Sequence, residues 1–225
     1  RGHFERLKHW IESIPDKVLK TRPQLPFWYV PSLLYKEEFD KVEKYLQIME
    51  MAEPEELRQR FISTVWTSRA LVAVVCGDLA KADEFGEKAS ESLLPDDVKQ
   101  KAVVLHTTVC RARLRGDMKE LERTVLEALP VYQQAGHFLF ATWAKTYLAF
   151  SQAMQGKLRA GAESMQDVIR YAEANIPNRP EPFIYPYAVL CDFHREWNDL
   201  ETAKLFLNKA LTQIQHTGNE SFMLL

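Results

Sequence analysis

The chain has 225 residues, 46% of them hydrophobic and 27% charged, which is enough to bury a substantial core. Its net charge of −2 argues against a surface that holds a polyphosphate backbone over its whole area, so we expect no direct nucleic-acid contact by this segment. No apolar run approaches the ~20 residues that cross a bilayer, and three cysteines without a CxxC pair favour a reducing, cytoplasmic setting over a disulfide framework.

A turn followed by an amphipathic helix recurs along the chain at intervals of about 40 residues. Each copy begins at a turn residue, called the anchor here, with a large apolar residue at +2 and small or apolar residues at +5, +9 and +12. These offsets lie along one stripe of a helix with 3.6 residues per turn, so each anchor is predicted to open a helix with one buried face. The anchors are Gly2, Glu37, Gly77, Gly116, Gly156 and Asn198.

Glycine and asparagine suit an anchor because they reach positive φ at low cost, whereas Glu37 does not fit this preference. The later positions of the pattern are apolar or glycine in every copy. The +5 column reads Leu7, Val42, Ala82, Leu121, Gly161 and Ala203. The +9 column reads Ile11, Leu46, Gly86, Val125, Met165 and Leu207, and the +12 column reads Ile14, Met49, Ala89, Ala128, Val168 and Ala210.

A second helical run precedes most anchors, so the repeating unit is helix, short turn, helix. In chain order we predict units at 1–20 (partial), 23–52, 55–94, 96–135, 137–175 and 181–216. The proline-rich stretch 176–182 is predicted to be a loop between the last two hairpins. Trp10, Trp28 and Trp66, which lie in apolar clusters, are assigned to the buried surfaces of their helices.

Stacked hairpins bury a continuous core between neighbours, which a single hairpin cannot do. We therefore predict an all-α, tetratricopeptide-like solenoid, wound as a right-handed superhelix, with about five hairpins after a leading helix. Residues 1–225 are expected to form a single helical-repeat domain that is a fragment of a longer chain. The small residue at +5, such as Ala82, Ala203 or Gly161, is predicted to let two helices pack closely.

Two segments resemble the MalT-type regulators, the large ATP-dependent members of the LuxR transcriptional family. "RGHFERLKHWIESIPDKVLKTRPQL", residues 1–25, is similar to that family's Trp-apolar-Glu-x-apolar-Pro run, which leads through a Leu to a Pro-x-Leu helix start. "EWNDLETA", residues 196–203, resembles its Glu-x-Asn-Asp-Leu-x-x-Ala turn. The matching positions of the first segment are Trp10, Ile11, Glu12, Ile14, Pro15, Leu19, Pro23 and Leu25.

The resemblance implies a ligand-sensing and oligomerisation region, whose partners are a small-molecule inducer or a protein and a second copy of the chain. Such regulators carry a nucleotide-binding module and a DNA-binding helix-turn-helix in other domains. ATP is therefore expected only in an absent neighbouring domain, and we expect no cofactor, no metal and no enzymatic activity here. The two glycines of "GKLRAG", residues 156–161, lack the Lys-Ser/Thr that a phosphate loop requires.

The resemblance also implies that the first helix of each hairpin lines a concave face. The candidate binding residues on that face are His106, Arg113, Trp143, Thr146, Phe150, Tyr185, Asp192 and Arg195. Aromatic rings beside polar groups suit a sugar or another small polar ligand, and they also suit a peptide. Structural interpretations stand beside this one: helix packing for Trp143 and Phe150, and a satisfied or solvated side chain for His106 and the two arginines.

Two functions therefore remain open from the sequence. The first is the sensing region of a MalT-type transcriptional activator. The alternative is a free-standing helical-repeat scaffold that holds a protein or peptide in its concave groove. A phosphate-loop motif upstream and a helix-turn-helix downstream in the parent gene would separate them.

Overall fold

The computed structural model describes residues 2–217, and every regular element within them is an α-helix. This confirms the predicted all-α, tetratricopeptide-like class. Within the described range no helix has both the length and the apolar character needed to cross a membrane. The helices are α1 (Gly2–Glu12), α2 (Asp16–Lys20), α3 (Gln24–Tyr35), α4 (Phe39–Glu50), α5 (Glu55–Val75), α6 (Leu79–Glu91), α7 (Val98–Arg115), α8 (Met118–Ala135), α9 (Phe138–Met154), α10 (Leu158–Asn175), α11 (Glu181–Glu196) and α12 (Leu200–Thr217).

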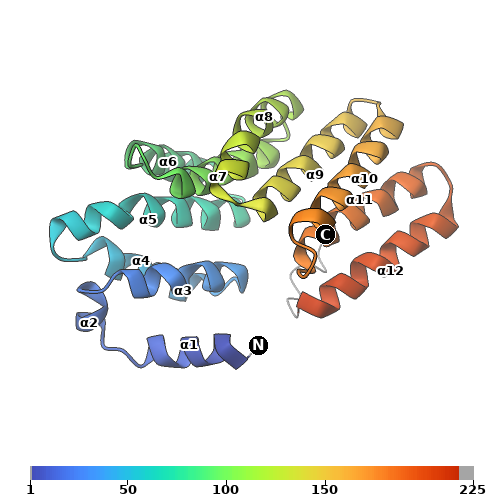
Figure 1. The fold of residues 1–225 in the computed structure, drawn as a ribbon. Helices are drawn as coiled ribbons and strands as arrows, with labels where there is room; N and C mark the ends of the chain where they lie inside the picture. Colours follow the sequence, from blue (N-terminus) through green and yellow to red (C-terminus); the bar gives the residue numbers. More distant parts are fainter. Residues whose placement is uncertain (1, 218–225) are drawn as a thin grey trace. The chain divides into compact units, whose positions relative to one another are not determined.

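The helices belong to two compact units, residues 1–115 and 116–225 (Figure 1). In the first unit α3 packs on α4, α5 packs on α6, and α7 lies against both α5 and α6. In the second unit α8 packs on α9, α9 on α10, and α11 on α12. The boundary falls at the turn inside the predicted hairpin 96–135, and the single-domain organisation stays a prediction.

The turns lie where the anchors predict them. Glu37 and Asn198 have φ values of 57° and 58°, and Gly77, Gly116 and Gly156 have φ values of 74°, 73° and 84°. Gly2 is the first residue of α1. Glu37, whose residue type does not favour a positive φ, therefore adopts the same backbone conformation as the glycine anchors. The register of the repeat consequently identifies this turn better than residue preference does.

The strained turn at Glu37 leads to a prediction. A left-handed conformation costs a non-glycine residue about 1–2 kcal/mol, which a substitution by glycine would remove. Glycine also makes the unfolded chain more flexible, and this lowers the stability of the folded state by about 0.4–1 kcal/mol. We expect Glu37→Gly to raise the free energy of unfolding in urea by about 0.5 kcal/mol. Met51→Gly is the control, because Met51 also follows a helix but has a φ of −96°. It should lower stability, and a loss of stability from both variants would contradict the prediction.

The predicted buried columns are buried in the structure. Of the +5, +9 and +12 positions whose side chains are described, all are buried except Ile14, which is partly buried, and Leu207, which is 46% exposed. Leu207 belongs to α12, the last described helix, whereas its counterpart Met165 on α10 is covered within a core that includes Leu190 and Phe193 of α11. The +5 and +12 positions of α12, Ala203 and Ala210, are buried nonetheless, so only the +9 position of this helix lacks the cover that Met165 has.

The assignment of Trp10 and Trp28 to buried surfaces is wrong. Trp10 is 53% exposed and Trp28 is 71% exposed. The helix α3 is apolar on all sides, and it turns Tyr29, Val30 and Leu33 toward the core of the first unit instead. Periodicity could not select the buried face of such a helix, because no polar face marks the opposite side.

Candidate ligand-binding surface

The eight predicted site residues divide between the two units. His106 and Arg113 lie on α7 in the first unit. Trp143, Thr146 and Phe150 lie on α9, and Tyr185, Asp192 and Arg195 lie on α11, all in the second unit. Helices α9 and α11 contact each other, so the second unit brings six of the eight residues onto two neighbouring helices.

In the first unit His106 is buried, with 6% of its surface exposed, and Arg113 is exposed. The Nε2 atom of His106 lies 3.6 Å from the Sγ atom of Cys110, one helical turn further along α7. Burial raises the pKa of the Cys110 thiol to about 11. This thiol is therefore protonated at neutral pH, which makes it a poor nucleophile.

The cysteines give a second prediction. The thiolate is the species that reacts, and at pH 8 the raised pKa of Cys110 keeps its thiolate fraction low. We expect iodoacetamide to modify the exposed Cys76 at pH 8 while Cys110 stays unmodified in the folded chain. Peptide mass spectrometry measures both. Unfolding in urea should make the two cysteines react alike, and fast modification of Cys110 without urea would contradict the burial.

In the second unit Thr146 is 1% exposed, and its hydroxyl donates a hydrogen bond of 2.9 Å to the carbonyl oxygen of Thr142 on the same helix. Burial leaves little of Thr146, as of His106, for a ligand to contact. Trp143 and Tyr185 are partly buried. The ring of Trp143 stacks on Phe140 at 6.0 Å, and the ring of Tyr185 meets Tyr147 edge-on at 6.3 Å.

The remaining residues form the accessible part of this surface. Phe150 is 36% exposed, and Asp192 and Arg195 are exposed one turn apart on α11. The Nε atom of Arg195 lies 3.5 Å from a carboxylate oxygen of Asp192, and its Nη2 atom lies 2.7 Å from Glu196. Exposed ion pairs of this kind contribute little to folding, so these charges are available to orient a polar ligand. We call Trp143, Phe150, Tyr185, Asp192 and Arg195 the α9–α11 surface.

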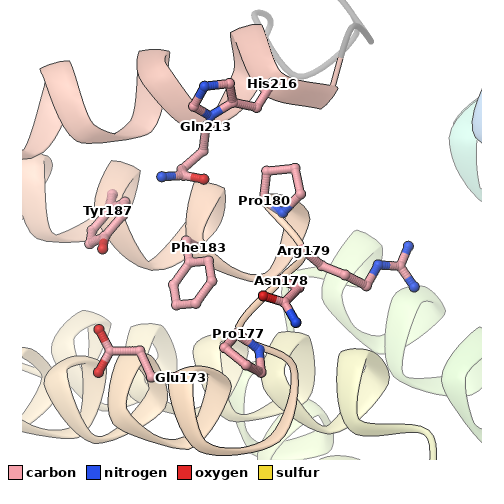
Figure 2. Close-up of a pocket in the computed structure, with 9 residues that line it drawn as sticks. All are labelled: Glu173, Pro177, Asn178, Arg179, Pro180, Phe183, Tyr187, Gln213 and His216. Atoms are coloured by element: carbon pink, nitrogen blue, oxygen red, sulfur yellow. The ribbon is translucent and has the colours of Figure 1, made fainter. Parts of the chain in front are cut away.

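A cavity that the sequence analysis missed lies elsewhere in the second unit. It has a volume of about 440 Å³ and is formed by the end of α10, the loop before α11, the start of α11 and the end of α12. Figure 2 shows Phe183 and Tyr187 between Glu173 on one side and Gln213 on the other, while Arg179 extends away from them. Arg179 instead pairs with Glu181 at 3.1 Å.

Glu173 brings a negative charge close to the aromatic side chains of this cavity. Burial raises the pKa of Tyr187, and the negative charge of Glu173 raises it further. An aromatic floor beside a carboxylate and an amide provides stacking area and hydrogen-bonding groups for a small polar molecule. The sequence carried no signal for this site, because the proline-rich stretch 176–182 was predicted only as a loop and the end of α12 contributes from the far side of the hairpin.

Helical hairpins of this kind, with positive-φ turns at a regular register and small residues where helices cross, define the tetratricopeptide-like repeat proteins. The model of one such family, the MalT-like TPR region, matches residues 63–225, which is more than half of the chain. The chain belongs to this family. The match includes the turn at residues 196–203 and begins after the segment 1–25, and no curated protein matches the chain.

Proposed function

We propose that this chain is the ligand-sensing region of a LuxR-family, MalT-type transcriptional regulator, and that a small polar inducer bound to it alters its self-association. Membership of the MalT-like TPR family carries the proposal. The α9–α11 surface supports it, because Asp192, Arg195 and part of the Phe150 ring are exposed on two helices that contact each other. A ligand that prefers one arrangement of the repeats would shift the population toward that arrangement.

The test is a thermal-shift screen of the chain against neutral sugars and other small polar metabolites. A ligand that binds only the folded state raises the apparent melting temperature by mass action. For a compound that raises it, Asp192→Ala is expected to weaken binding by about tenfold, the effect of one lost charge-assisted hydrogen bond. Sedimentation with and without the compound then measures self-association.

Asp167→Ala is the matched control. Asp167 and Arg170 form an exposed i,i+3 pair on α10, as Asp192 and Arg195 do on α11. Glu173→Ala separates the α9–α11 surface from the cavity in Figure 2. Loss of binding only in Glu173→Ala would move the site to that cavity, and equal loss in Asp167→Ala would contradict both locations. A screen without any stabilising compound, together with saturable binding of a peptide, would favour the scaffold function instead.

A further inference from the structure

The hairpin α5–α6 holds a ring pair covered by a lysine. The rings of Trp66 on α5 and Phe85 on α6 stack with centroids 5.8 Å apart and an interplanar angle of 23°. The Nζ atom of Lys88 lies 4.7 Å from the Trp66 centroid and 5.8 Å from the Phe85 centroid. A cation over two aromatic faces stabilises the packing of this hairpin.

The hairpin α11–α12 repeats this arrangement at the same positions relative to its anchor. Tyr187 and Phe206 stack at 6.2 Å and 30°, and Lys209 lies 5.5 Å and 5.3 Å from their centroids. Counted from Asn198, these three residues occupy the places that Trp66, Phe85 and Lys88 occupy relative to Gly77. The two hairpins can therefore be compared position by position.

The second hairpin continues its ring stack beyond Phe206. The imidazole of His194 stacks on Phe206 at 5.4 Å and 29°. The indole of Trp197 meets His194 edge-on at 5.2 Å. His194 is held in place by Asp199, whose carboxylate lies 3.0 Å from its Nδ1 atom. The ring of His194 thus lies against Phe206, and Trp197, which is 38% exposed, extends the row of rings beyond it.

The first hairpin has small residues at the positions of these two rings. Ala73 takes the place of His194, and Cys76 takes the place of Trp197. Phe193, which is 4% exposed and belongs to the core of the second unit, is likewise replaced by the smaller Val72. A cavity of about 340 Å³ lies at this place, and Val72, Ala73, Cys76 and Phe85 all line it.

The rim of this cavity is charged. Arg69, which lies at the position of the buried Leu190, forms an ion pair of 2.8 Å with Glu43. At the turn between α5 and α6, Asp78 pairs with Lys81 at 3.0 Å. All four of these residues line the cavity, so its lining combines apolar side chains with charged hydrogen-bond donors and acceptors.

We propose that this cavity binds a small planar aromatic molecule, whose ring takes the place that His194 and Trp197 fill in α11–α12. Phe85 lines the cavity, and aromatic rings gain from stacking beyond the area that they bury. Apolar cavities in proteins bind ring compounds of matching size. A polar substituent on the ligand would meet the ion pairs at the rim. The cavity shares no residue with the α9–α11 surface, so this inference stands apart from the proposed function.

The test uses 5-fluoroindole as the probe and fluorine NMR of the probe with the full chain. We expect saturable line broadening at micromolar to millimolar probe concentrations. Ala73→His with Cys76→Trp rebuilds the ring pair of the second hairpin and should weaken binding by about tenfold or more, because the added rings occupy the cavity. The far-ultraviolet circular dichroism of the variant reports whether the helices are kept.

Two further variants complete the design. Val72→Phe also fills the cavity, with the residue that the second hairpin has at this position. If the double variant loses its helical signal, Val72→Phe still allows binding to a filled cavity to be compared with binding to the unmodified chain. Met51→Trp is the control, because it adds the same ring at an exposed helix end that does not line the cavity. Absence of saturable broadening with the unmodified chain, or equal binding after the cavity is filled, overturns the proposal.

Discussion

Replacing Leu190 with alanine is expected to lower the free energy of unfolding by about 3 kcal/mol, within the range for deleting a buried leucine side chain and leaving a cavity. Leu190 on α11 is fully buried, and it belongs to a core with Met165 of α10 and Phe193. This core joins two successive hairpins, so the loss acts on the contact that stacks them. Equilibrium unfolding in urea, followed by circular dichroism, measures it.

Leu205→Ala is the matched control for this prediction. Leu205 is a leucine in the same unit, on α12, and it is 52% exposed. The same deletion there removes little buried surface, so we expect a change within about 0.5 kcal/mol. Similar losses from the two variants would mean that the exposed side of α12 is covered in solution, or that Leu190 is less buried than the structure shows.

Introducing leucine at Gly161 is expected to lower the free energy of unfolding by about 2 kcal/mol. A Cβ atom at this position would lie 2.9 Å from the carbonyl oxygen of Ala149 and 3.0 Å from the Cβ atom of Ala153, both on α9. A backbone oxygen cannot rotate away as a side chain can, so α9 and α10 must separate. Overpacking of this kind costs about 1–3 kcal/mol, and the better helix propensity of leucine offsets less than about 1 kcal/mol.

Ala160→Leu provides the comparison, since Ala160 is the preceding residue of α10 and is exposed. Its effect on the urea midpoint should be small. Unfolding in urea measures both variants, and retention of full stability by Gly161→Leu would show that the two helices do not approach this closely. Gly161 is the +5 residue of its repeat, so these variants also test the prediction that a small residue at +5 permits close packing.

The repeat register predicts which helices carry the candidate site residues, but it does not predict which of these residues are exposed to solvent. It selects α9 and α11 as neighbours, and the structure places Trp143 and Tyr185 on these two contacting helices. It does not reveal that Thr146 satisfies its hydroxyl within α9 and is covered. Accessibility depends on the size of side chains from the neighbouring helices, and a helix as apolar as α9 gives no periodic signal for its exposed face.

The ring-sized cavity in the first unit illustrates the same limit. Ala73 and Cys76 are unremarkable in the sequence, because small residues are frequent in helices that pack closely. Their significance appears only when the structure places them with Phe85 in the lining of one cavity and supplies the comparison with His194 and Trp197. A cavity forms where the side chains of neighbouring helices do not fill the space between them, so a local sequence pattern does not predict it.

The all-α class, the hairpin register, the turns and most of the buried columns can be predicted from the sequence alone. These follow from local chemistry: the periodicity of apolar residues selects a helix face, and a regular anchor selects a turn, even at Glu37. The exposure of Leu207 and Trp28, the burial of Thr146 and His106, and the positions of the cavities become visible only in the folded chain. The physical reason is that burial and cavities depend on what a neighbouring helix supplies, which no single helix encodes.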